Sequence, residues 1–318
     1  MNALLPILLL ILLLIAPTTS IQGAQNGLLL WFNTVLPTLS PFLICTQLVA
    51  SSGGMELLMR PFAPVLRRIF GLSVPGGYIL LCGLICGYPL GARLCADFSS
   101  RGVISRSEAS YLLSICNHPS PMFLLGYVKS QLPATVSPIL LLTCLYLPVL
   151  PLSLMSGYFY QFRTRKNAAA AQDTYASQSI PTAQGEPAAR LTLDEILMST
   201  CETMVIIGGY IMLFSILASW IGQLTFLSAR AQALLCGIAE ITTGVHQICM
   251  TWPAKDCLLP VIGIVAFGGC SGIFQTRSVL RASKNAGLSI RHYLVWKAVH
   301  AMLSCLVLIL LQVPLLHP

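Results

Sequence analysis

Glu240 is the most chemically distinctive residue of this sequence, because it lies in the apolar stretch LLCGIAEITTGVHQI. On insertion scales an acidic side chain at the centre of a bilayer costs on the order of 3 kcal/mol, so such a residue usually faces a cavity or a partner. We interpret Glu240, with Thr242 and Thr243 after it, as a polar wall that binds a cation or hydrogen-bonds a solute. The alternative is a residue near a helix end, or one paired with a basic loop.

A second group of polar residues interrupts the apolar stretch SICNHPSPMFLLG, residues 114–126. Its polar side chains are those of Asn117, His118 and Ser120, and its prolines are Pro119 and Pro121. Each proline lacks the backbone N–H that a helical carbonyl would use. Carbonyls freed in this way coordinate ions or hydroxyl-bearing ligands in transporters. The alternative is a proline-kinked helix whose polar groups are satisfied by neighbouring helices.

Two apolar phrases rich in glycine resemble each other. The first is CGLICGYPLGARL, with Gly83, Gly87, Pro89 and Gly91, and the second is AFGGCSGIFQTRS, with Gly268, Gly269 and Gly272. Glycine and proline can turn a chain at membrane depth, where non-helical backbone is tolerated only against protein or a water-lined cavity. A half-helix that begins near Ser271 and Gln275 would attract anionic or carbonyl groups to its N-terminus. The alternative is an unbroken helix in which small residues four apart pack against a neighbour.

The amino-acid composition indicates that most of this chain lies in a membrane. Of 318 residues, 56% are hydrophobic and 9% are charged, and the mean hydropathy is +0.80. A soluble domain carries about 25% charged residues. Apolar runs that approach or reach the length needed to cross a bilayer, about 20 residues, occur at 3–16 with its flanks, 27–50, 133–160, 196–221 and 293–313. We therefore predict an all-α, multi-pass protein of the cytoplasmic membrane.

The stretch 161–192 is rich in Ala, Gln, Ser and Pro and has no helical apolar period. We predict that it is a flexible cytoplasmic linker. It divides the chain into a first membrane half, 27–160, and a second membrane half, 193–318. A transmembrane helix, 1–26, precedes them. Because no Lys or Arg stands before its apolar run, we favour a retained helix over a cleaved signal.

Basic residues set the expected topology, because Lys and Arg concentrate in cytoplasmic loops. The stretches 51–72 and 93–108 each contain three arginines. Both stretches lie on the cytoplasmic side only if 73–92 enters the membrane and returns as a re-entrant hairpin. We predict a second hairpin around 258–280, so that the two halves are related repeats that meet at broken helices. The charges leave open whether the repeat is inverted.

Several classes of function are not indicated. No catalytic motif such as Gly-x-Ser-x-Gly or His-Glu-x-x-His occurs, so we predict that the chain is not an enzyme and uses no cofactor. The 12 cysteines include no Cys-x-x-Cys pair and no zinc-site spacing, so we predict no metal site. The net charge of +8 is the loop excess of Lys and Arg and indicates no nucleic acid.

The stretch GLICGYPLGARLCADFSSRGVISRSEASYLLSICNHPSPMFLLG, with the phrases GIAEITTG and FGGCSGIFQ, resembles the YlbJ family of sporulation integral membrane proteins. The resemblance covers roughly residues 30–312. That family carries the nucleoside-recognition or Gate domain, which also occurs in concentrative nucleoside transporters and in the ferrous-iron transporter B family. The matching positions are Gly87, Pro89, Gly91, Asn117, Pro121, Glu240, Gly244, Gly268, Gly269 and Ser271.

The resemblance implies a multi-pass protein of the cytoplasmic membrane that takes part in making the spore cortex and contains a transport-like gate. The sequence departs from the family pattern at His118 and Pro119, where smaller polar residues are expected. No phrase matches the nucleoside-contacting segments of nucleoside transporters. The resemblance therefore does not identify a solute.

The leading hypothesis is a transporter-like protein in which two hairpin tips enclose a small polar solute near the middle of the membrane, with a coupling ion. Glu240 and Asn117 would then face one shared cavity. The alternatives are a scaffold or receptor for envelope assembly, and a metal permease that uses Cys270. The expected surroundings are the lipid bilayer, and a homo-oligomer is left open.

Overall fold

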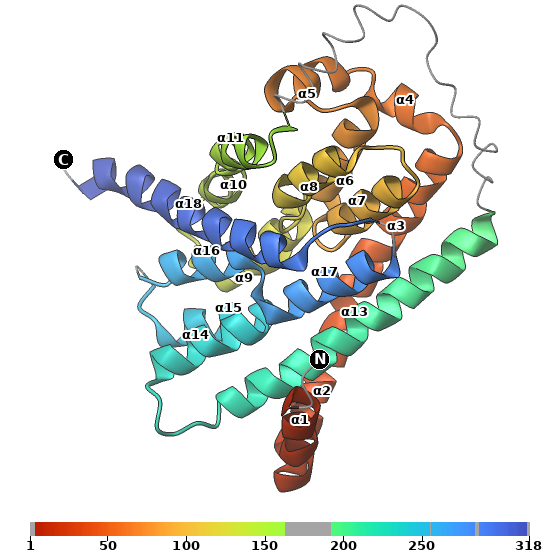
Figure 1. Ribbon diagram of the computed structural model, residues 1–318. Coiled ribbons are helices and arrows are strands. Elements are labelled where there is room, and N and C mark those ends of the chain that lie inside the picture. The colour runs from red at the N-terminus through yellow and green to blue at the C-terminus, as the bar shows by residue number, and fades with distance from the viewer. Residues whose placement is uncertain (1–3, 163–191, 255, 284–285, 317–318) are drawn as a thin grey trace, which may run out of the picture.

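The computed structural model describes residues 4–162, 192–254, 256–283 and 286–316 (Figure 1). Every regular element in these ranges is helical. Five helices in them are long and apolar enough to cross a membrane: Pro17–Ser51, Pro138–Phe159, Leu193–Ile221, Leu258–Ala282 and Ile290–Leu311. The bent pair Ala63–Phe70 and Val74–Cys86 adds a sixth if it crosses as one span. The prediction of an all-α, multi-pass membrane protein is confirmed.

The predicted linker 161–192 lies outside the described residues, except for Gln161, Phe162 and Thr192. Thr192 caps α13 (Leu193–Ile221) through its hydroxyl, and its backbone N–H donates to the Glu195 carboxylate at 2.8 Å. This reciprocal pair satisfies N–H groups that the first turn of a helix leaves free. The division of the chain at residues 26, 160 and 192 stays a prediction.

Two long helices lie side by side (Figure 1). The first long helix follows α1 (Leu4–Ile15) and is a continuous run of α2 (Pro17–Leu30), the π-helical η1 (Trp31–Val35) and α3 (Leu36–Ser51). The second long helix is α13. Gly23 and Gly27 let the two backbones approach, because a Cβ at these positions would lie 2.8 and 2.9 Å from backbone atoms of α13. The indole of Trp31 donates to the Met204 carbonyl at 2.9 Å.

The short helices α6 (Val74–Cys86) and α7 (Leu90–Ser100) form a packed pair that follows α4 (Gly54–Met59) and α5 (Ala63–Phe70). The chain bends by 92° between α5 and α6. Helix α6 then packs against α7, and Gly87, Tyr88 and Pro89 join the two. Gly87 has a φ of 84°, which residues with a side chain rarely adopt. The glycine phrase therefore turns the chain between short helices, as expected, and its re-entry from one side of the membrane stays a prediction.

The next helix is interrupted where the prolines predict a break. Helix α8 (Arg106–Ile115) ends before a non-helical stretch, 116–120, and the helix resumes into η2 (Phe123–Val128) and α9 (Lys129–Gln131). Two apolar helices, α10 (Pro138–Tyr146) and α11 (Val149–Phe159), complete this part of the chain. The break places backbone groups inside the protein, where side chains must satisfy them.

The second membrane part contains another packed pair of short helices, α14 (Ala229–Ala239) and α15 (Ile241–Thr251), with Glu240 between them. Gly237 and Gly244 make the contact close, because a Cβ on Gly244 would overlap the backbone of Gly237. The structure differs here from the hairpin expected around 258–280. Helices α16 (Leu258–Phe267) and α17 (Gly269–Ala282) form one helix of spanning length with a local break at Gly268.

The reason for this difference is the geometry of the second glycine phrase. Gly268 and Gly269 have φ values of 87° and 63°, which interrupt the helix without reversing its direction. The last helix is α18 (Ile290–Leu316). In both parts, a long helix is followed by a short packed pair, a helix broken within its length, and further apolar helix. That the two halves are related repeats stays a prediction.

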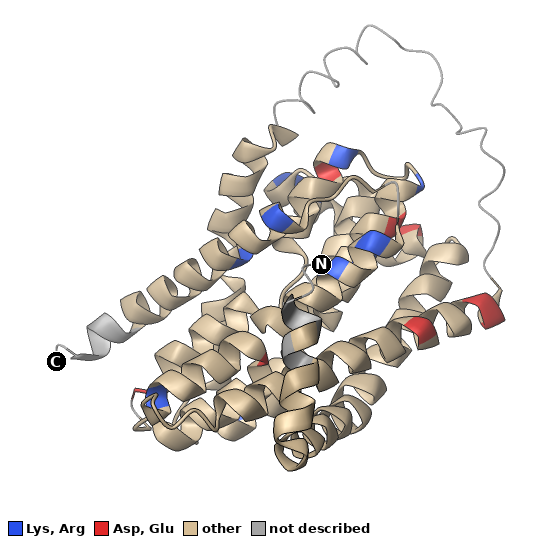
Figure 2. Ribbon diagram, turned by 60° about the horizontal axis from the view of Figure 1, so that its bottom comes forward, with Lys and Arg blue, Asp and Glu red and all other residues tan. Residues whose placement is uncertain are grey.

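Pro64 and Ser100 are expected to be accessible from the same, cytoplasmic side of the membrane. Figure 2 shows Lys and Arg gathered in the upper part of the view and few in the lower part, as the concentration of basic residues in cytoplasmic loops predicts. Single cysteines at these positions, in a variant without native cysteines, should both react with an impermeant thiol reagent in inside-out vesicles. Labelling of the two from opposite sides would exclude the re-entrant hairpin.

Candidate functional site

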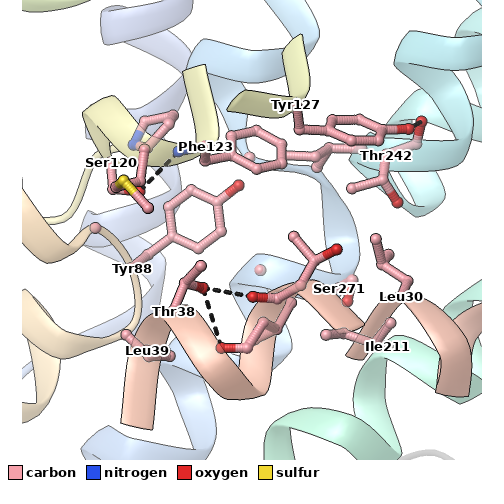
Figure 3. A pocket seen from close by; sticks show the side chains of 18 of the residues that line it. Leu30, Thr38, Leu39, Tyr88, Ser120, Phe123, Tyr127, Ile211, Thr242 and Ser271 are labelled. Carbon is pink, nitrogen blue, oxygen red and sulfur yellow. Dashed lines mark hydrogen bonds between the residues drawn. The ribbon is translucent and has the colours of Figure 1, made fainter. Parts of the chain in front are cut away.

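A cavity of about 320 Å³ lies where the broken helices and the short helix pairs meet. Its wall is built by α3 with η1, the turn between α6 and α7, the break before η2, and the first residues of α15 and α17 (Figure 3). Nine of the residues singled out from the sequence line it: Gly87, Pro119, Ser120, Glu240, Thr242, Gly268, Ser271, Gly272 and Gln275. The two glycine phrases and the Glu240 phrase therefore come together in space.

Glu240 lies at the tip between α14 and α15 and is 4% exposed. Its carboxylate caps α15, accepting from the backbone N–H groups of Thr243 at 2.8 Å and Thr242 at 3.2 Å. The hydroxyls of both threonines also donate to it, that of Thr243 at 3.0 Å. A helix N-terminus and charge-assisted hydrogen bonds are the partners that a buried carboxylate needs in place of a cation.

The two carboxylate oxygens of Glu240 are not equally occupied. Oε2 accepts from the Thr243 backbone and from both threonine hydroxyls, whereas Oε1 accepts from the Thr242 backbone alone. A carboxylate oxygen has more than one acceptor site. Oε1 is therefore the atom with capacity to accept a hydrogen bond from a solute in the cavity.

Tyr88 joins the two glycine phrases. Its backbone N–H donates to the His118 carbonyl at 3.1 Å, which ties the α6–α7 turn to the break after α8. Its ring lies against α17, because a Cβ on Gly272 would be 3.3 Å from the ring and one on Gly268 would be 3.8 Å from it. In Figure 3 the ring extends into the middle of the cavity. Small residues on α17 therefore make room for this side chain.

Two further aromatic rings form another wall. Phe123 and Tyr127 on η2 stack with their centroids 5.6 Å apart. The Tyr127 hydroxyl donates to the Thr242 carbonyl at 2.8 Å, which holds η2 against α15. These residues and Tyr88 are not among those predicted from the sequence. Their spacing gives a partial signal, because Phe123 and Tyr127 are four residues apart, on one helical face.

The remaining polar wall comes from α3 and α17. The Gln275 side chain donates to the Ser271 hydroxyl at 3.0 Å. Thr38, four residues after Thr34, donates to the Thr34 carbonyl at 2.6 Å, and both threonines line the cavity. This pair is not among the residues predicted from the sequence. Two threonines at this spacing in an apolar helix mark one polar face, which is the signal that identifies them.

Asn117 does not line the cavity, and the structure does not place it beside Glu240 as predicted. Its amide donates to the Tyr293 hydroxyl at 2.8 Å and to the Thr276 hydroxyl at 3.1 Å, and it accepts from the Ala92 N–H at 3.4 Å. The side chain is 1% exposed. Asn117 therefore ties α7, α17 and α18 together behind the cavity wall, and its partners are too distant in sequence for the sequence to indicate them.

His118 and several predicted gate residues also lie behind the wall. The His118 ring is 1% exposed and packs against His300, with the ring centroids 4.1 Å apart. A Cβ on Gly83 or Gly91 would overlap the Cys116 carbonyl oxygen. The other predicted residues outside the lining are Pro89, Pro121, Thr243, Gly244 and Gly269. Whether any predicted residue binds a solute stays a prediction.

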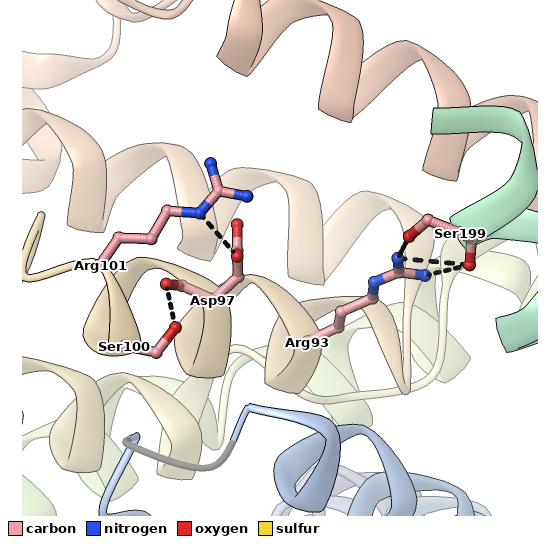
Figure 4. Close-up of polar contacts among 5 residues, drawn as sticks. All are labelled: Arg93, Asp97, Ser100, Arg101 and Ser199. Carbon is pink, nitrogen blue, oxygen red and sulfur yellow. Dashed lines mark hydrogen bonds and ion pairs between the residues drawn. The ribbon is translucent and has the colours of Figure 1, made fainter. Parts of the chain in front are cut away.

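A second cavity, of about 270 Å³, lies between α7, α13 and α17. Arg93 lines it and donates to the Ser199 carbonyl at 3.4 Å and to the Ser199 hydroxyl (Figure 4), as well as to the Thr203 hydroxyl. Asp97 and Arg101 form an ion pair at 2.8 Å. None of the candidate residues predicted from the sequence is among the described residues that line this second cavity, so we assign the candidate solute site to the first cavity.

The described residues contain no group of three or more His, Cys, Asp or Glu side chains that could hold a metal ion. Cys270 lies in the second glycine phrase and is half-buried. It is not among the residues that line the first cavity. The metal-permease alternative therefore gains no support from the geometry around this thiol.

Comparison with known proteins identifies a curated relative. The chain is 27% identical over 326 aligned positions to the sporulation integral membrane protein YlbJ of Bacillus subtilis (strain 168), and the alignment covers 94% of this chain and 79% of that protein. No protein-family model matches the chain, and no solved structure does. The long alignment, the helical spans and the motifs agree. The chain is a multi-pass membrane protein, and its similarity to this relative supports the resemblance to the YlbJ family of sporulation integral membrane proteins.

Proposed function

We propose that this protein is a transporter-like membrane protein without catalytic chemistry, and that it moves a small polar solute through the Glu240 cavity during formation of the spore cortex. The observation that carries the proposal is the buried Glu240 carboxylate, which lines a cavity of about 320 Å³ between interrupted helices. A carboxylate in an apolar segment is costly and commonly marks a solute or ion pathway.

The elements around Glu240 favour transport over a scaffold. The cavity is bounded by two turns between short helices and by two helix breaks. At these places the regular backbone hydrogen bonding of the helices is interrupted. Transporters use such interrupted helices to present backbone and side-chain polar groups to a solute. A scaffold that only binds other proteins at its surface does not require this internal polar surface.

The lining indicates which chemistry the solute presents. Its polar groups are the Glu240 carboxylate, the hydroxyls of serine, threonine and tyrosine, and the amide of Gln275. No Lys, Arg or His is among the described residues of the lining. The rings of Tyr88, Phe123 and Tyr127 provide apolar faces. We therefore expect a small solute with hydrogen-bond donors for Glu240 and an apolar part for the rings.

The test is flux from vesicles into which the purified protein has been reconstituted. The vesicles are loaded with a defined mixture of amino acids, sugars, nucleosides, small amines and divalent metal ions, and mass spectrometry follows what leaves. We expect one class of donor-bearing solute to leave faster than from protein-free vesicles. No accelerated class with a folded protein would favour the scaffold, and a metal flux abolished by Cys270→Ser would favour the permease.

A further inference from the structure

Lys297 is a buried lysine that has no carboxylate partner among the described residues. It lies on the apolar helix α18, and its side chain is 2% exposed. The ion pair recorded within the described ranges joins Asp97 to Arg101, and no carboxylate there pairs with Lys297. A buried charge is tolerated only if other groups replace the water that it loses. The groups around its Nζ atom therefore decide what this lysine does.

The Nζ of Lys297 reaches the break after α8. It donates to the backbone carbonyl of Asn117 at 3.4 Å. In a continuous helix this carbonyl would accept from the N–H four residues later, but position 121 is a proline, which has none. Pro121 thus leaves the Asn117 carbonyl without a backbone donor. Lys297, which is 180 positions after Asn117, donates the hydrogen bond in its place.

The neighbouring carbonyls of the break have other donors. The His118 carbonyl accepts from the backbone of Tyr88 at 3.1 Å, and the Pro119 carbonyl accepts from the Tyr146 hydroxyl at 2.7 Å. Of these three carbonyls, that of Asn117 is the one that accepts from a lysine side chain. Carbonyls at such breaks coordinate alkali ions in transporters.

The other groups facing Lys297 favour one positive charge here and disfavour a second. The ring of Tyr88, from the α6–α7 turn, has its centroid 5.8 Å from Nζ, which is within reach of a cation–π attraction. The packed rings of His118 and His300 lie on the break and on α18, and both are buried. Neither ring nitrogen of His118 has a partner within hydrogen-bonding geometry. An added metal cation would be repelled by the ammonium, and no carboxylate of the described residues pairs with Lys297 to offset this repulsion.

We propose that the Lys297 ammonium is a built-in cation for the break between α8 and η2. It occupies the carbonyl position that an alkali ion would otherwise take, so the protein needs neither Na⁺ nor K⁺ there. The coupling ion expected from the sequence is then not bound at the Asn117 carbonyl. The inference concerns how the break is held and stands whether or not the cavity transports a solute.

The test is the thermal stability of the full-length protein in detergent, with Na⁺, K⁺ or ethylammonium added to a buffer of a bulky organic cation. We expect Lys297→Met, which keeps the length of the side chain and removes its charge, to lower Tm by roughly 5 °C or more. Lys297→Ala leaves space at the carbonyl, and ethylammonium should restore much of its lost Tm. The wild-type Tm should not respond to any of the three cations.

Lys129→Met is the matched control, because Lys129 also donates to backbone carbonyls, those of Pro133 at 3.1 Å and Ala134 at 3.4 Å, but is only half-buried. Its Tm should change little and should not respond to added cations. The proposal is overturned if Lys297→Met melts with the wild type, or if no cation raises the Tm of Lys297→Ala. If the Lys297 variants fail to fold, the wild type decides: stabilisation by Na⁺ or K⁺ would also overturn it.

Discussion

Replacing Gly83 or Gly91 with valine is expected to destabilise the fold by about 3 kcal/mol, through overpacking that the backbone cannot relieve. Gly83 lies one turn before the end of α6 and Gly91 lies in the first turn of α7. A Cβ at either position would overlap the carbonyl oxygen of Cys116. Both glycines therefore hold the short helix pair against the start of the break, and backbone, unlike a flexible side chain, has no alternative rotamer.

The measurement is the midpoint of thermal unfolding in detergent, together with the fraction of protein that elutes as a folded species. Gly209→Val is the control, since a Cβ on Gly209 of α13 meets no atom within 4 Å. We expect it to melt within a few degrees of the wild type. If Gly83→Val and Gly91→Val are as stable as Gly209→Val, the close approach of the two glycines to Cys116 is not needed for the stability of the fold.

Glu240→Ala and Glu240→Gln are expected to separate the structural role of Glu240 from its role toward a solute. Glu240→Ala removes the cap of α15 and leaves buried N–H groups of Thr242 and Thr243 without an acceptor, which costs about 2 kcal/mol. Glu240→Gln keeps one oxygen for these donors but loses the charge. We expect it to fold and to lower solute flux at least about tenfold, or about 1.4 kcal/mol.

The readouts are the unfolding midpoint and the vesicle flux of each variant. Glu56→Gln is the control for the loss of one negative charge, because Glu56 is exposed on α4. Its flux should equal that of the wild type. Wild-type flux in Glu240→Gln would show that Glu240 only caps α15. Equal loss of folding in both Glu240 variants would show no role of the charge toward a solute that is separate from its role in folding.

The sequence predicts the elements of this fold better than their pairing. Uninterrupted apolar runs identify the spans, because a backbone in lipid must satisfy its own hydrogen bonds. The second hairpin was misplaced since the glycines at 268 and 269 suggested a turn, whereas the short pair is held by Gly237 and Gly244 on either side of Glu240. A glycine phrase alone does not distinguish a reversal from a local break.

The candidate site shows the same limit. The partners of Glu240 are its next residues in sequence, so the phrase Glu-Ile-Thr-Thr already encodes the cap. The partners of Asn117 are 159 and 176 positions away, and the carbonyl that Lys297 contacts is 180 away. No local pattern specifies such contacts, because they depend on how α8, α17 and α18 pack.

Chemical modification of Cys86, a native thiol that lines the Glu240 cavity, tests that cavity most directly. In a variant that keeps Cys86 and has every other cysteine replaced, a methanethiosulfonate with a fixed positive charge should react faster than a negative one of similar size. Glu240→Gln should remove most of this preference, and the solute found by vesicle flux should slow both reactions. Equal rates for the two reagents, unaffected by Glu240→Gln, would contradict a solute cavity controlled by Glu240.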